Sequence, residues 1–196
     1  MGLLFSSCEK QVLVPVPRPG NPNNPVTPVT PNYTSGSLET VFNDHWDRWD
    51  LRVNDSSGSY QTVFSNDWDR WDISAGGATY DMSTVFPEDW DNWEMDGNGQ
   101  SISLRTVFSE DWDNWELKDS RSGITYSIKT VFSEDWDRWS VYANDGTDVM
   151  DMSTVFSNDF DRWDITNYRV NNPVHRACML FIPVFISAIY QQGIIH

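Results

Sequence analysis

The sequence predicts an all-β protein made of tandem β-hairpin repeats, and three observations support this fold class. Residues 40–170 of the 196-residue chain contain six copies of one unit, spaced 22 or 24 residues apart. Within each copy apolar and polar residues alternate with a period of two, which is typical of strands with one buried face. Glycine, asparagine and serine separate the alternating segments at regular intervals and indicate hairpin turns.

The first eight residues, MGLLFSSC, end in two serines and a cysteine after a short apolar run. This arrangement resembles the lipobox of bacterial lipoproteins, although the basic segment and the roughly 7–15 apolar residues of a complete signal peptide are missing. We therefore interpret residues 1–8 as a truncated signal and lipobox. The resemblance implies that Cys8 is lipidated. It also implies an extracytoplasmic protein, at the cell surface or in the periplasm, which meets the membrane only through the lipid.

Residues 9–39 are rich in proline, asparagine, threonine and valine, with seven prolines between Pro15 and Pro31. Proline fixes φ and lacks a backbone donor, so this segment is incompatible with a regular helix or a central strand. We expect an extended, semi-rigid tether between the anchor and the repeats.

The six repeats share an opening motif, Thr-Val-Phe followed by three variable residues, an aromatic residue, Asp, one variable residue and Trp; the aromatic residue is Trp in five copies and Phe160 in the sixth. Each copy reads as a strand, a corner, a second strand and a hairpin turn, so six copies give about twelve short strands. In the corner, Phe86, Trp90 and Trp93 are spaced as on a helix, and Pro87 before two acids is typical of a helix start. We expect short helical corners that bury the phenylalanine and at least one tryptophan. The copies begin at Thr40, Thr62, Thr84, Thr106, Thr130 and Thr154.

One repeat cannot bury its apolar face alone, so neighbouring repeats must stack. The expected arrangement is a solenoid or superhelical meander, and the alternative is a closed up-and-down β-barrel. The two extra residues in the fourth and fifth copies preserve strand parity, which a hairpin turn tolerates.

The eleven tryptophans all lie in the corners. They have two interpretations: a core, because the repeats contain few leucines and isoleucines, or an exposed ladder of rings that stacks on a glycan. The candidate ligand-stacking residues are the second tryptophan of each copy: Trp49, Trp71, Trp93, Trp115, Trp139 and Trp163.

The acidic charge belongs to the repeats. They hold 27 of the 29 acidic residues and 10 of the 13 basic ones, within a net charge of −16. Such a surface repels nucleic acid and favours cations or a basic protein partner. No cofactor is indicated, but carboxylates at this spacing could ligate calcium. A solvated acidic face is the simpler interpretation. The candidate calcium ligands are Asp47, Asp69, Asp91, Asp113, Asp137 and Asp161.

Catalysis is not expected, because the same carboxylate pairs recur in every copy whereas a glycosidase uses one pair across one cleft. Residues 171–196 form an apolar tail of uncertain status: a cap on the repeats, a binding tail, or, as preferred, a segment foreign to the fold. Taken together, the sequence predicts a non-catalytic, surface-anchored repeat module for binding, adhesion or structural display. A calcium-stabilised domain and a glycan-binding module are the alternatives.

Overall fold

The computed structural model describes residues 33–42, 45–53, 56–65, 67–157 and 159–194. These residues form twelve β-strands and one α-helix. The strands are β1 (Thr34–Thr40), β2 (Arg48–Val53), β3 (Ser56–Thr62), β4 (Arg70–Ala75), β5 (Ala78–Thr84), β6 (Asn92–Gly97), β7 (Gln100–Thr106), β8 (Asn114–Asp119), β9 (Thr125–Thr130), β10 (Arg138–Ala143), β11 (Asp148–Phe156) and β12 (Asp159–Asn167), and the helix is α1 (Pro173–Gln191).

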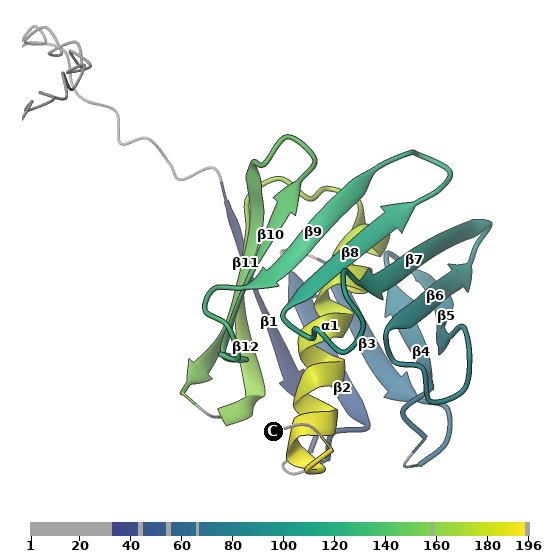
Figure 1. The fold of residues 1–196 in the computed structure, drawn as a ribbon, viewed down its shortest axis with the longest axis vertical. Coiled ribbons are helices and arrows are strands. Elements are labelled where there is room, and N and C mark those ends of the chain that lie inside the picture. Colours follow the sequence, from purple (N-terminus) through teal and green to yellow (C-terminus); the bar gives the residue numbers. More distant parts are fainter. Residues whose placement is uncertain (1–32, 43–44, 54–55, 66, 158, 195–196) are drawn as a thin grey trace, which may run out of the picture. The chain divides into compact units, whose positions relative to one another are not determined.

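The strands close into a single antiparallel barrel in which each strand pairs with its neighbours along the chain (Figure 1). The last strand, β12, pairs with the first, β1, over six residue pairs. The all-β class and the closed-barrel alternative are therefore confirmed, and the preferred solenoid is wrong. Closure satisfies the backbone donors and acceptors that a solenoid would leave exposed on its two terminal strands.

The register repeats with the sequence. In every copy the threonine that opens the corner motif lies opposite the second tryptophan, as Thr62 does to Trp71 and Thr106 to Trp115. The two extra residues of the fourth copy lie in the turn β8–β9. In the fifth copy the register of β10 and β11 shifts between Val141 and Tyr142, so the extra length is divided between the turn and this irregularity. The barrel thus has an approximate sixfold symmetry that follows from the repeats.

Side chains alternate between the inside and the outside of the barrel. In β4, Trp71, Ile73 and Ala75 are buried, whereas Arg70 and Asp72 are exposed. The same alternation in the other strands makes an outer wall of serine, threonine and charged residues. This outer surface is polar, as in a barrel surrounded by water, whereas a transmembrane barrel presents an apolar band to lipid.

The helix α1 fills the barrel and provides the centre of its core (Figure 1). Residues 174–189 are all buried, and the ring of Phe181 packs against Trp71 and Trp93 at centroid distances of 5.6 and 4.9 Å. Eight strands can be filled by their own side chains, but twelve enclose a wider interior that needs a further element. The preferred interpretation of the tail as foreign to the fold is therefore wrong. By length and composition α1 could also cross a membrane, but here it is buried within the protein.

The barrel has two different ends. The turn end carries the short hairpin turns, and both β1 and α1 begin there. Pro173 lies so close to the left-handed Gly76 (φ 59°) that a Cβ on this glycine would be 2.7 Å from the proline ring. The corner end carries the six Thr-Val-Phe corners, and α1 finishes there, where Tyr190 packs against Phe160 at 4.9 Å.

Candidate functional site

Each corner opens with a tight turn where the sequence predicted a helix. In the third copy, the carbonyl of Phe86 accepts a hydrogen bond from the N–H of Asp89 at 3.0 Å. Between them lie Pro87 and Glu88, and Glu88 has a left-handed φ of 59°. Proline followed by a residue of positive φ is the pattern of a type II turn. Because proline's fixed φ suits both this turn and the first turn of a helix, the sequence signal was ambiguous.

The turn leaves the phenylalanine outside the barrel, so the prediction that it is buried is wrong. The phenylalanines of the six Thr-Val-Phe motifs are between 59% and 69% exposed. The neighbouring Val85, Val107 and Val131 are between 46% and 49% exposed. Exposed apolar rings therefore surround the corner end, one from each repeat. We call these side chains the phenylalanine rim: Phe42, Phe64, Phe86, Phe108, Phe132 and Phe156.

Acidic side chains accompany the rim. Glu88, Glu110 and Glu134 are exposed, each two residues after a rim phenylalanine. All three have φ of 59° or 60°, a conformation that costs a non-glycine residue roughly 1–2 kcal/mol. Asp159 is exposed at the sixth corner. The corner end is thus both apolar and negatively charged.

The candidate ligand-stacking tryptophans lie inside the barrel. Trp49, Trp71, Trp93, Trp115, Trp139 and Trp163 are at most 1% exposed, so a ligand on the surface has no access to their faces. The hypothesis of an exposed tryptophan ladder is wrong, and these rings form the core. In five copies the indole Nε1 donates to the carbonyl of the first ring residue of the same corner at 2.7–3.0 Å. In the sixth copy, Nε1 of Trp163 is buried without a partner.

The central aspartate of each corner fastens one repeat to the next. Asp113 accepts hydrogen bonds from the hydroxyls of Thr130 and Ser133, both at 3.0 Å, and from the N–H of Glu134 at 3.1 Å. Asp91 makes the equivalent contacts with the fourth copy. The carboxylate therefore holds the next turn in its left-handed conformation, because it accepts from the N–H of the strained glutamate.

Asp69, Asp137 and Asp161 also join neighbouring repeats through their carboxylates, with variations. Where Pro87 replaces the turn serine, Asp69 instead accepts from the indole of Trp90 at 2.7 Å, in addition to the N–H of Glu88. Asp161 of the last copy accepts from the hydroxyl of Thr40 at 3.3 Å and so links the sixth repeat to the first. Asp137 accepts from Ser157 at 3.0 Å, and the backbone carbonyl of Asp47 accepts from the N–H of Thr62 at 3.0 Å.

These contacts bear on the calcium hypothesis. A calcium site needs six to eight oxygen ligands around one point, but the six aspartates are distributed one to a corner around the barrel. Among the residues that the structure describes, no group of three or more acidic, histidine or cysteine side chains is placed to hold a metal ion. The hydrogen bonds give the aspartates a structural role that needs no ion.

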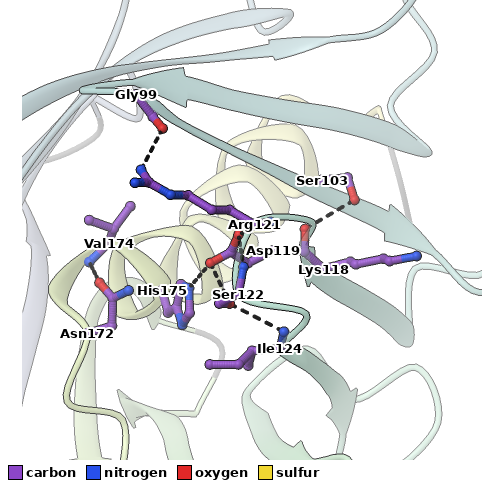
Figure 2. Close-up of polar contacts among 10 residues, drawn as sticks. All are labelled: Gly99, Ser103, Lys118, Asp119, Arg121, Ser122, Ile124, Asn172, Val174 and His175. Carbon is purple, nitrogen blue, oxygen red and sulfur yellow. Dashed lines mark hydrogen bonds and ion pairs between the residues drawn. The ribbon is translucent and has the colours of Figure 1, made fainter.

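The turn end holds a buried polar cluster that the sequence analysis did not single out (Figure 2). The carboxylate of Asp119 accepts hydrogen bonds from Nε2 of His175 at 3.0 Å and from the hydroxyl of Ser122 at 2.7 Å. Burial raises the pKa of Asp119, but the bonds from Ser122, His175 and the backbone outweigh it and lower the pKa to about 2. The cluster attaches the first turn of α1 to the end of β8.

A sequence signal for this cluster did exist. Asp119 occupies the inward position that Val53 and Ala75 fill in the first two copies. A carboxylate at a core position requires a polar partner, and His175 is one of the two histidines of residues 171–196. The sequence does not by itself pair Asp119 with His175, because nothing local shows that the apolar tail belongs to the core.

The two cysteines lie in different regions. The candidate lipidation residue Cys8 is outside the described residues. Cys178 is a free thiol on α1, fully buried, and burial raises its pKa well above the usual value. Cys178 is therefore shielded from modification in the folded barrel.

No protein-family model matches the chain, and no curated protein or solved structure matches it either.

Proposed function

We propose that this protein is a non-catalytic binding module that acts outside the cytoplasm and engages its partner through the phenylalanine rim. The observation that carries the proposal is the exposure of six phenylalanines at one end of the barrel. Large apolar side chains are usually buried in soluble proteins, and a group of exposed ones at one end of a fold marks a site of association. Aromatic side chains also contribute a large share of the binding energy at interfaces.

The rim has no role in the barrel that would account for it. Inward positions of the repeats vary in size, as the aligned Tyr60 and Leu104 illustrate, yet every corner has phenylalanine at the exposed position. Burial would stabilise an exposed phenylalanine by about 1.5–3 kcal/mol, so leaving six of them in water sacrifices free energy of folding. A partner that covers the rim would recover part of this free energy.

The position of the rim suits an anchored protein. β1 begins at Thr34 on the turn end, and the rim lies at the corner end. A chain anchored by a lipid on Cys8 would therefore enter the barrel at the end opposite the rim. We propose this arrangement for a display or adhesion role at the cell surface or in the periplasm.

Retention on a phenyl resin tests the rim as a binding surface. The full chain should be retained at moderate salt, and the triple variant Phe86→Ser, Phe108→Ser, Phe132→Ser should elute much earlier with its circular dichroism unchanged. A control, Val141→Ala in the core, should not elute earlier. Equal retention of the triple variant and the parent protein would disprove the proposal.

The anchor is tested separately by metabolic labelling with palmitate in a bacterial host. When the chain is preceded by a complete signal peptide, label should appear in the membrane fraction with the parent sequence and with Cys178→Ala, and should disappear with Cys8→Ser. Label that persists in Cys8→Ser would exclude Cys8 as the anchor, while leaving the rim proposal untouched.

A further inference from the structure

We infer that the partner of the phenylalanine rim is a cationic amphipathic helix, that is, a helical protein segment whose apolar face is flanked by lysine or arginine. The inference rests on the proposed function and adds the chemistry of the partner. It is carried by the combination of exposed phenylalanines and exposed glutamates at the same corners.

Charge complementarity favours a basic partner over the alternatives. Glu88, Glu110 and Glu134 are exposed beside rim phenylalanines, and the protein as a whole carries a net charge of −16. A second copy of the chain would bring the same acids face to face, and an anionic membrane would repel them. A partner with apolar groups set among cations meets both features of the rim.

The exposed glutamates also carry a conformational cost that the barrel does not require. The corresponding positions 66 and 158 hold asparagine, so the repeat motif does not itself require glutamate there. Glutamate stands at the same position in three consecutive copies, each with φ near 60°. The backbone contact to the preceding aspartate needs only an N–H, so the acidic side chain is available to a partner.

The spacing of the rim fits a helix. Neighbouring strands lie about 4.8 Å apart, so corners that are two strands apart on a tilted barrel are on the order of 10–12 Å from each other. A helix that repeats an apolar side chain every seven residues places these side chains about 10.5 Å apart. Such a helix can contact two neighbouring phenylalanines, while cations beside its apolar face reach the intervening glutamates.

The test uses the full chain and a synthetic amphipathic peptide of lysine and leucine, with the leucines on one helical face. Its counterpart with glutamate in place of lysine is the charge control. Binding is measured by fluorescence anisotropy at several salt concentrations. We expect the lysine peptide to bind and become helical, the glutamate peptide not to bind, and affinity to fall as salt rises.

Three variants separate the contribution of the phenylalanines to peptide affinity from that of the glutamates and from that of the overall charge. The triple Phe→Ser variant at positions 86, 108 and 132 should lose affinity at least about a hundredfold. The variant Glu88→Gln, Glu110→Gln, Glu134→Gln should bind about tenfold more weakly, with a shallower dependence on salt. A control with the same change of net charge, Asp72→Asn, Asp96→Asn, Asp164→Asn on the outer wall, should change affinity less than about twofold.

The outcomes distinguish this inference from the proposed function. Equal weakening by the rim and wall charge variants would mean general attraction to an acidic protein and would overturn the inference. Binding to phosphatidylcholine vesicles without binding to the peptide, or self-association abolished by the Phe→Ser variant, would assign the rim to a membrane or to a second copy instead. If the phenyl resin retains the parent chain but the lysine peptide does not bind, only the inference fails.

Discussion

The indole N–H of the second tryptophan distinguishes the sixth corner from the other five. Trp115 donates to the carbonyl of Trp112 at 2.7 Å, whereas Nε1 of Trp163 is buried without a partner. The first ring of the sixth corner is Phe160, which lies within the long strand β12 and packs against Tyr190 of α1. At this corner the Phe160 ring packs on the end of the helix, and the local hydrogen bond of the other five corners is absent.

This difference predicts unequal effects of the same substitution. Trp115→Phe should lower the free energy of unfolding by about 1 kcal/mol more than Trp163→Phe, because only the first loses a hydrogen bond while both lose similar apolar area. Urea unfolding followed by far-ultraviolet circular dichroism measures both. Equal losses would contradict the assigned hydrogen bond at Trp115.

The aspartate between the two ring positions predicts a second effect at this scale. Asp113→Ala should lower the free energy of unfolding by about 2–3 kcal/mol, because it removes a charged acceptor shared by two hydroxyls and a backbone N–H. Asp96→Ala, an exposed aspartate of the outer wall, should change it by less than about 0.5 kcal/mol. Added calcium should leave the unfolding midpoint of the parent protein unchanged; a large increase would support the calcium hypothesis instead.

At the scale of elements, the strands were predictable from the sequence, but the corners and the helix were not. Alternation places Trp71, Ile73 and Ala75 on one face whatever the tertiary structure, so local pattern suffices for a strand. The rings of the corner have helical spacing, yet the phenylalanine, Phe86, is exposed and the two tryptophans that follow it pack towards the core from a turn. Ring spacing alone does not distinguish a helical corner from a tight turn, because a turn can also direct rings to one side.

The helix α1 was missed because its burial depends on the whole barrel. Its residues are apolar all round, which suits a helix buried on every side, and Pro183 within it argued against a regular helix. Only the width of a twelve-stranded barrel explains why such a segment is needed.

Two phenylalanines test the burial of this helix against the exposure of the rim. The ring of Phe185 lies 4.8 Å from Trp93 and 5.7 Å from Trp90, so Phe185→Ala should lower the free energy of unfolding by about 3–5 kcal/mol. Phe132→Ala in the rim should change it by less than about 0.5 kcal/mol. Chemical denaturation provides both values, and comparable losses would refute the assignment of one ring to the core and the other to the surface.

The attachment of α1 to β8 predicts a dependence on pH. The pKa of Asp119 is lowered from 3.8 to about 2, so its ionised form is favoured in the folded state. Its contribution to stability is therefore fully present above about pH 4 and is lost as the pH falls towards 2. Unfolding free energies between pH 5 and pH 2 should fall less steeply in Asp119→Asn than in the parent protein. Identical slopes would exclude Asp119 as a source of the acid sensitivity.

At the scale of the whole molecule, the sequence left the choice between solenoid and barrel open for a physical reason. Stacked hairpins make the same local contacts in both, and the two differ only in whether the first and last strands meet. The contacts that close the ring, such as the bond from Thr40 to Asp161, join residues 121 positions apart and have no local signature. The exposure of the phenylalanine rim was not predictable either, because the turn in each corner determines the direction in which the phenylalanine side chain points.

Closure of the barrel is the central claim, since it places the tryptophans inside and the phenylalanine rim around one end. Ser37 of β1 lies opposite Asp164 of β12. Directly opposed residues of antiparallel strands have Cα atoms about 4.5–5.5 Å apart, within the range that a disulfide spans. The pair Ser37→Cys, Asp164→Cys, in a chain that also carries Cys8→Ser and Cys178→Ala, can therefore link the first repeat to the last.

The most direct measurement is oxidation of this pair, followed by mass spectrometry and non-reducing electrophoresis. The closed barrel predicts an intramolecular disulfide in monomeric protein, whereas the control pair Ser37→Cys, Asp96→Cys, placed on strands that do not pair, should keep two free thiols. Free thiols or only intermolecular disulfides in the Ser37–Asp164 pair would contradict closure, and with it the arrangement of the rim.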